Sequence, residues 1–259
     1  MLRLNDLKLP LNHDETALRK SILARLAIQD DELKTVSIFK RSYDARKKGD
    51  IQLIYQLDIS LDAKREAELL ARFEGKSFLS PSPDTDYKFL AHAQSDFPNE
   101  EQQRPVIIGF GPCGILAALV LAQMGLKPIV LERGQDVRQR TKDTWGLWRE
   151  RKLNTESNVQ YGEGGAGTFS DGKLYSQVKD RRYLGRKVMT EFVKAGAPEE
   201  ILMVSKPHIG TFKLVKMVEN IRAEITRLGG EIRFNTKVDV IHREQSSDAQ
   251  GQITGLTLS

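Results

Sequence analysis

The chain has 259 residues, of which 39% are apolar, a share that is typical of globular proteins and excludes a disordered or fibrous one. At roughly 100 to 200 residues per domain, this length favours two domains. The formal net charge is +5, and the excess lies in residues 105–259, which hold 23 Lys and Arg against 17 Asp and Glu. This surplus falls short of the clustered basic stripe of a dedicated nucleic-acid binder and matches an anionic cofactor.

The cysteine content and the apolar runs indicate the compartment. Cys113 is the single cysteine, so an intrachain disulfide is excluded and a reducing environment is expected. The histidines lack metal-ligand spacing, and no metal site is predicted. The N-terminus has no signal-peptide core, and the longest apolar run, Ile115–Ala122, is far below the ~20 residues of a membrane span. We therefore expect a cytoplasmic protein with no membrane partner.

Residues 1–75 are predicted to form a small α+β domain. Apolar alternation and clustering predict strands at 2–9, 34–41 and 51–59 and helices at 14–27 and 62–73. Asp62 is the expected N-cap of the second helix. The resulting β-α-β-β-α order is typical of a ferredoxin-like domain of the split βαβ kind.

A linker is predicted at 76–104, where Pro, Ser and polar residues replace periodic patterns. Two short segments within it, 77–79 and 87–90, are candidate edge strands. From residue 105 the pattern changes to α/β, and we predict a Rossmann-like domain with a βαβ unit and a parallel sheet over 105–259. Its expected strands are 106–108, 128–132, 231–235, 237–242 and 252–258, with a turn at 246–251, and its expected helices are 112–124, 135–152, 182–195 and 211–228.

The sequence from Gly109 to Gly114 matches the dinucleotide-binding pattern G-x-G-x-x-G and includes Pro112 and Cys113. It follows a predicted strand and begins a predicted helix, which is the context that gives this common pattern weight. Gly109 allows the tight turn, Gly111 lets backbone amides approach a pyrophosphate, and Gly114 allows close helix–strand packing.

An acidic residue completes this pattern. Glu132 ends the next predicted strand, where a carboxylate accepts hydrogen bonds from the hydroxyl groups of the adenosine ribose. The same negative charge repels a 2′-phosphate and disfavours NADP at this site. The motif therefore leaves NAD and FAD as alternatives.

A second glycine-rich segment favours FAD. Five glycines fall between residues 162 and 172 and are interleaved with small polar residues, so the backbone can approach a ligand closely. FAD is longer than a βαβ unit can cover, and a second loop supplies contacts toward the ribityl chain and flavin. A flexible surface loop is the alternative explanation.

Together, these motifs resemble FAD-dependent oxidoreductases of the two-dinucleotide-binding-domain group. More narrowly, the whole chain resembles bacterial FAD-dependent dehydrogenase-like proteins. The resemblance implies that Glu132 binds the ribose, that Arg133 lies near the adenosine or pyrophosphate, and that the backbone of Val238 meets the adenine. It also implies cofactor contacts from the second loop, at Gly164, Gly165, Ala166, Gly167 and Thr168.

The chain departs from this family in its extent. In the family, the segment equivalent to 252–258 is followed by another strand, a substrate domain and a Gly-Asp element. We therefore expect an incomplete flavin fold, either the N-terminal portion of a longer protein or a degenerate homologue.

Other candidate residues carry less weight. Cys113 at a helix start is interpreted as a small packing residue rather than a reactive thiol, because no partner cysteine exists. His208 is expected in a loop, Asp171 and Lys173 in the second loop, and Trp145 with Trp148 in the core.

The leading hypothesis is an FAD-dependent oxidoreductase that transfers hydride or electrons, with a small-molecule substrate and NAD(P)H as a candidate electron donor; its catalytic residues are unknown. One alternative is a flavoprotein whose N-terminal domain binds RNA, suggested by Lys40, Arg41 and 46–48 with Tyr43. The near-neutral charge of residues 1–104 disfavours nucleic acid. The other alternative is a non-catalytic NAD-binding module.

Overall fold

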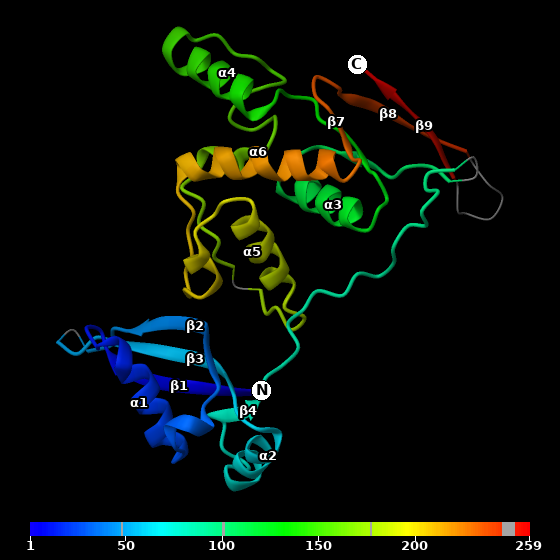
Figure 1. Cartoon of the computed structure of the whole chain (residues 1–259). Coiled ribbons are helices and arrows are strands. Elements are labelled where there is room, and N and C mark those ends of the chain that lie inside the picture. Colours follow the sequence, from blue (N-terminus) through cyan, green and yellow to red (C-terminus); the bar gives the residue numbers. More distant parts are fainter. Residues whose placement is uncertain (48, 100–101, 177, 245–251) are drawn as a thin grey trace. The chain divides into compact units, whose positions relative to one another are not determined.

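The computed structural model describes residues 1–47, 49–99, 102–176, 178–244 and 252–259 (Figure 1). The chain forms two compact units. Unit 1 comprises Met1–Asp86, Tyr175–Met189 and Glu199–Pro207, and unit 2 comprises Tyr87–Leu174, Thr190–Pro198 and His208–Ser259. These bounds differ from the predicted domains 1–75 and 105–259, because two segments from the second half of the chain and part of the expected linker group with unit 1.

Unit 1 is built on an antiparallel sheet of four strands in the order β2-β3-β1-β4. The strands are β1 (Leu2–Pro10), β2 (Thr35–Asp44), β3 (Gln52–Ser60) and β4 (Leu79–Pro81). The helices are α1 (Glu15–Leu26) and α2 (Ala63–Arg72), with a 3₁₀ turn at Asp30–Glu32. The short β4 pairs with the beginning of β1 and lies partly within the edge segment predicted from the sequence.

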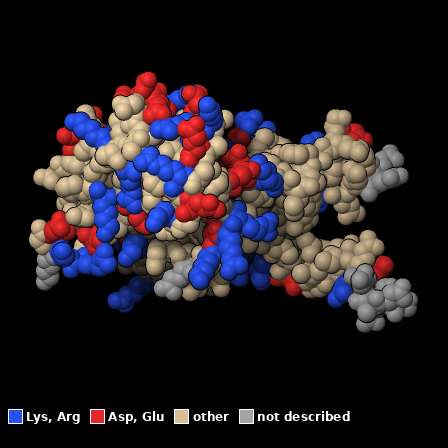
Figure 2. All heavy atoms as spheres, turned by 90° about the horizontal axis from the view of Figure 1, so that it is seen from below, with Lys and Arg blue, Asp and Glu red and all other residues tan. Residues whose placement is uncertain are grey.

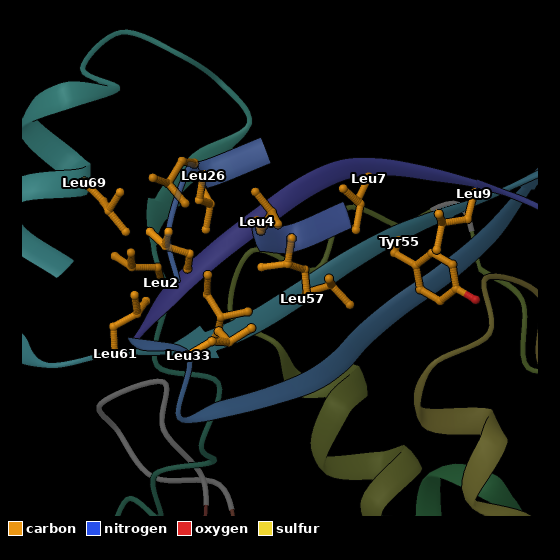
Figure 3. Packing of buried hydrophobic residues seen from close by; sticks show 14 of the residues in the cluster. Leu2, Leu4, Leu7, Leu9, Leu26, Leu33, Tyr55, Leu57, Leu61 and Leu69 are labelled. Atoms are coloured by element: carbon orange, nitrogen blue, oxygen red, sulfur yellow. The ribbon is translucent and has the colours of Figure 1, made fainter. Parts of the chain in front are cut away.

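Alternation along the central strands creates the core of unit 1. In β3 every second residue is buried, because successive side chains point to opposite faces of the sheet. Leu57 of β3 and Leu4 of β1 are fully buried, and Leu26 of α1 and Leu69 of α2 lie beside them in the same cluster (Figure 3). Both helices therefore bury their apolar stripes on one face of the sheet.

The two helices of unit 1 begin at Asp residues, of which one caps the helix through its side chain. The side chain of Asp14 accepts a hydrogen bond from the amide of Ala17 at 2.7 Å and caps α1. Asp62 occupies the N-cap position of α2 as expected, but its side chain makes no capping hydrogen bond and instead pairs with Lys34. The predicted N-cap position of Asp62 is therefore confirmed, and the structure adds that its side chain bonds elsewhere.

The segment 199–207 joins unit 1 by backbone pairing at the edge strand β2. The amide of Arg41 donates to the carbonyl of Met203 at 2.6 Å, and the amide of Ser205 donates to the carbonyl of Arg41 at 3.0 Å. Nearby, Arg3 forms a bidentate ion pair with Asp58 and stacks on Phe39 at 3.5 Å from the ring centroid. These contacts explain why residues distant in sequence belong to this unit.

Unit 2 contains a parallel sheet of three strands in the order β5-β6-β7. The strands are β5 (Val106–Ile108), β6 (Ile129–Leu131) and β7 (Glu231–Arg233). Helix α3 (Pro112–Gln123) connects β5 to β6 as a parallel crossover and packs beside α6 (Thr211–Arg227), which precedes β7 (Figure 1). The chain is thus a mixed α/β protein with a parallel sheet, as the sequence predicted.

Unit 2 also contains elements outside this sheet. Helix α4 (Val137–Glu150) packs against α6, and the hairpin of β8 (Val238–Arg243) and β9 (Ile253–Leu258) is antiparallel. Helix α5 (Leu184–Lys194) is divided between the units: its residues up to Met189 belong to unit 1, and those from Thr190 belong to unit 2. Residues 87–90 form no strand, and the predicted turn at 246–251 lies outside the described residues.

Among the helices that the structure describes, none combines the length and apolar character needed to cross a bilayer.

Candidate functional site

The carboxyl ends of β5, β6 and β7 meet at one edge of the parallel sheet, because neighbouring strands run in the same direction. A pocket of about 340 Å³ opens at this edge. Open α/β sheets bind ligands at the carboxyl ends of their strands. The pocket includes six of the residues singled out from the sequence, namely Gly109, Gly111, Glu132, Arg133, Gly165 and Val238.

The first glycine-rich turn has the backbone geometry that the motif predicts. Gly109 has a φ of 91°, and its amide donates to the carbonyl of Leu131 at 2.7 Å, which ties the turn to β6. A Cβ atom at Gly114 would lie 2.0 Å from the carbonyl oxygen of Gly109. Only glycine therefore allows α3 to approach the turn so closely.

The start of α3 presents backbone amides rather than a capping side chain. Gly111 is the N-cap residue and no described side chain caps the helix there. Pro112 occupies the first helical position and has no amide hydrogen, so Cys113 and Gly114 supply the next amides of the first turn. Cys113 is exposed. Such a helix start favours an anion through its amides and its dipole.

Glu132 is almost fully buried and binds the glycine-rich turn itself. Its Oε2 accepts a hydrogen bond from the amide of Phe110 at 2.6 Å, and its Oε1 accepts one from the amide of Gly134 at 2.8 Å. A carboxylate has about four acceptor positions, so Glu132 can accept further hydrogen bonds. From the sequence, only a ligand role was predicted for Glu132, and the structure adds that it shapes the turn.

Arg133 lies at the same pocket in a polar cluster that the sequence did not indicate. Its Nε donates to Glu156 at 2.5 Å, and its guanidinium group lies 4.2 Å from the ring centroid of Tyr161. Tyr161 and Gln160 also line the pocket, as does Lys237, which forms an ion pair with Asp239 at 3.0 Å. An aromatic ring beside a half-exposed cation forms a flat wall on which a planar ligand can stack.

The second glycine-rich loop packs directly on the first turn. The amide of Gly164 donates to the carbonyl of Phe110 at 2.8 Å. A Cβ at Gly165 would lie 3.1 Å from Pro112 Cδ and 3.3 Å from Gly111 Cα, so the two backbones cross at close range. The structure therefore brings together the two motifs that are separated by about fifty residues in the sequence.

Beyond this crossing lies a second pocket, of about 210 Å³, with a mainly apolar lining. The second loop contributes Gly164, Gly167 and Thr168, and α6 contributes Leu214, Met217, Val218 and Ile221. Pro112 lies at this pocket, whereas Ala166 and Cys113 are exposed and line neither pocket, and Gly114 is a packing residue. The predicted site residues other than Ala166 thus lie in two adjoining cavities or in the turn between them.

Two buried charged residues were missed by the sequence reasoning. Arg140 and Glu163 both have no solvent exposure. The guanidinium group of Arg140 donates to the carbonyls of Asn158, Val159 and Glu163 at 2.6–2.8 Å and holds the segment before the second loop. Burial lowers the pKa of Arg140 to about 10, so it stays protonated at neutral pH. No sequence motif marks Arg140, and the glycine-rich pattern around Glu163 does not single out its carboxyl group.

Several single-residue expectations have clear outcomes. Trp145 and Trp148 are not core residues, since 46% and 56% of their surfaces are exposed, and they form an edge-to-face pair on α4. Asp171 forms an ion pair with Lys173 within the second loop. His208 lies in a loop that forms a single bridge with the backbone of Lys173. Among the described residues, no cluster of His, Cys, Asp and Glu could hold a metal ion.

Comparison with known proteins gives limited matches. Residues 1–60 match the family model described as a domain of unknown function (DUF8436). A Clostridium beijerinckii protein described as an uncharacterized protein is 45% identical over 242 residues, which are 93% of this chain and 43% of that protein. This chain therefore spans less than half the length of that relative.

Among solved structures, the crystal structure of Thermovibrio ammonificans THI4 has 16% sequence identity and a TM-score of 0.37. The likeness covers 60% of this chain and 46% of that chain. A resemblance of this size supports no argument about function, which depends instead on the geometry of the site.

Proposed function

We propose that unit 2 is an FAD-binding Rossmann-like domain that serves a flavin-dependent oxidoreductase. The observation that carries this proposal is the pocket at the carboxyl ends of the parallel strands, where Gly111, Glu132 and the second glycine-rich loop come together. The bound flavin would supply hydride or electron transfer, and the chain would bind and orient it. The proposal includes a small-molecule substrate and NAD(P)H as the candidate electron donor.

The residues present fit a dinucleotide. At Gly111 a Cβ would meet only Gly165 Cα at 3.9 Å, so an absent side chain leaves room beside the start of α3. The exposed amides there favour a pyrophosphate, and Glu132 has remaining acceptor capacity for ribose hydroxyls. Tyr161 and the backbone of Val238 line the side of the pocket that an adenine would occupy.

The second pocket favours FAD over NAD. It adjoins the first glycine-rich turn through Pro112 and Gly164 and is lined mainly by apolar side chains of α3 and α6. A flavin ring is larger and less polar than a nicotinamide ring, and ligand sites are lined predominantly by apolar side chains. A module that binds only NAD has no flavin ring to place in this second cavity.

Nucleic-acid binding by unit 1 receives less support. Within the basic segment, Arg46 pairs with Asp44 at 2.6 Å, and Lys8 pairs with the same carboxylate at 3.2 Å, so part of the segment's charge is compensated within the unit. On the face in Figure 2, cationic and anionic side chains are interspersed.

The fold of unit 1 and the location of the protein also belong to this proposal. The strand order of unit 1 supports a ferredoxin-like assignment. The single cysteine supports a reducing, cytoplasmic location.

The test is direct titration of the protein with FAD, FMN and NAD. Expected is FAD binding with a change in flavin fluorescence, weaker binding of FMN, which lacks the adenosine half, and no comparable binding of NAD. Glu132→Gln is expected to reduce the preference for FAD over FMN, because ribose hydroxyls lose charge-assisted hydrogen bonds. Equal binding of FAD and FMN by the wild-type protein contradicts the assigned adenosine pocket.

A further inference from the structure

Glu163 is a fully buried carboxyl group inside the second glycine-rich loop. Its Oε2 accepts a hydrogen bond from the amide of Val137, at the start of α4, at 2.7 Å. The same oxygen accepts one from Nη1 of Arg222, on α6, at 3.0 Å. One carboxyl group therefore ties the loop to two helices.

The backbone of Glu163 is held just as firmly. Its amide donates to the carbonyl of Gln135 at 3.0 Å, and its carbonyl accepts from Arg140 at 2.6 Å and from the hydroxyl of Thr168 at 3.3 Å. Side chain and backbone together give the residue contacts on both sides of the loop.

The glycines on either side face different cavities. Gly162 lines the pocket at the strand ends, and Gly164 lines the apolar pocket beside α6. Both have positive φ values, 113° and 85°. Glu163 therefore lies between two residues that line different cavities.

The carboxyl group has an incomplete set of partners. Among the described residues, no donor reaches its Oε1. From the α4 side it faces Asp136 and Arg140, and from the α6 side it faces Arg222 and Glu219, which itself pairs with Arg138. Arg138 is paired with Glu219 at 2.5 Å and Arg140 with backbone carbonyls, so Arg222 is the remaining cation that contacts the group.

We propose that Glu163 is a positioning residue for the cofactor: it holds the second glycine-rich loop in the shape that forms both cavities, and holds it more firmly when Oε1 carries a proton. This proposal rests on the proposed FAD site. It assigns to that site a control by protonation, exerted by a residue that lines neither cavity.

Burial supports the role of protonation. It raises the pKa of Glu163 to about 7, with the backbone bond from Val137 and the charge of Arg222 opposing the increase. The folded loop therefore favours the neutral carboxyl group, and ionisation leaves a buried charge with one unpartnered oxygen. The loop is expected to loosen as the pH rises through neutrality, and FAD affinity is expected to fall with it.

The experiment compares the wild-type protein with Glu163→Gln and Glu163→Asp between pH 6 and pH 8.5. Glu219→Gln is the matched control, because Glu219 is a partly buried, ion-paired carboxylate facing the same cluster. Two quantities are measured: the dissociation constant for FAD, and hydrogen exchange of the amides of residues 162–172 in the protein without FAD, corrected for intrinsic rates.

In the wild-type protein and in Glu219→Gln, exchange in this loop and the FAD dissociation constant are both expected to rise several-fold across this range. Glu163→Gln is expected to show flat profiles near the low-pH values, because its amide is neutral throughout. Glu163→Asp, which keeps a titrating group on a shorter chain, is expected to retain a pH dependence. Identical profiles for the wild-type protein and Glu163→Gln overturn the proposal.

Failure of the FAD proposal gives a different pattern. If no FAD binds at any pH, but loop exchange still depends on pH in the wild-type protein and not in Glu163→Gln, the cofactor assignment fails while the loop control by Glu163 stands. If FAD binds and loop exchange does not depend on pH, the control by Glu163 fails alone.

Discussion

The amide of Phe110 and the carboxylate of Glu132 lie 2.6 Å apart in a buried hydrogen bond that joins the first glycine-rich turn to the end of β6. This bond gives Glu132 two tasks, since the residue that is proposed to bind the ribose also fixes the turn. Loss of cofactor in a Glu132 variant therefore has two possible physical causes.

Replacement of Glu132 by Gln is expected to lower the free energy of unfolding of unit 2 by about 1–3 kcal/mol, even without cofactor. A Gln side chain can accept only through its oxygen, so one of the amides of Phe110 and Gly134 is left buried without a partner. Urea unfolding of the cofactor-free protein measures the change.

Glu156→Gln is the control for this prediction. Glu156 forms a half-exposed ion pair with Arg133, and pairs of this kind contribute little to stability. If Glu132→Gln unfolds at the same urea concentration as the wild-type protein, the structural task assigned to Glu132 is wrong.

Gly114→Ala is expected to destabilise unit 2 by about 1–3 kcal/mol, the usual cost of forcing extra volume into a closed contact. The new methyl group would lie 2.0 Å from the carbonyl oxygen of Gly109, and a backbone oxygen has little room to move. Thermal unfolding measures the loss.

Gly167→Ala serves as the matched variant in the second loop. No atom lies within 4 Å of the Cβ position there, and Gly167 has no positive φ. It is expected to unfold within a few degrees of the wild-type protein. Equal losses in the two variants contradict the close packing of α3 on the turn.

The stability of unit 2 is expected to fall as the pH rises from about 5 to 8. The pKa of Glu163 is raised to about 7 in the folded protein from an ordinary value of 4.5, so the folded state binds more protons than the unfolded state between these values. The stabilisation is complete below pH 4.5 and is lost as the pH passes 7, a change on the order of 3 kcal/mol.

Chemical unfolding of the wild-type protein and of Glu163→Gln at pH 5, 6, 7 and 8 measures this difference. The variant is expected to lack the component that Glu163 contributes, so the difference between the two proteins changes with pH. A difference that stays constant over this range rules out a raised pKa for Glu163.

In unit 1, Leu57→Ala is expected to lower the free energy of unfolding by about 2–5 kcal/mol. Leu57 of β3 is fully buried in the cluster that the sheet forms with the helices, and its truncation leaves a cavity. Leu11→Ala is the control, as 51% of the surface of Leu11 is exposed. Urea unfolding followed by circular dichroism compares them. Similar midpoints for both variants contradict the buried position of Leu57.

The sequence by itself determined the local elements and the first motif. Alternation in 51–59 predicted β3, the apolar periodicity of 211–228 predicted α6, and the glycines at 109, 111 and 114 predicted a strand–turn–helix whose geometry the structure has. These signals are local, because they depend on side-chain period and on backbone conformation at single residues.

Tertiary structure alone decided the rest. It placed the second loop on the first turn, joined residues 199–207 to β2, exposed Trp145 and Trp148, and buried Arg140 and Glu163. Burial and long-range backbone pairing depend on which surfaces meet, and a charged residue carries no local signal that it will lose its water. For the same reason the two tasks of Glu132 became separable only once its partners, Phe110 and Gly134, were known.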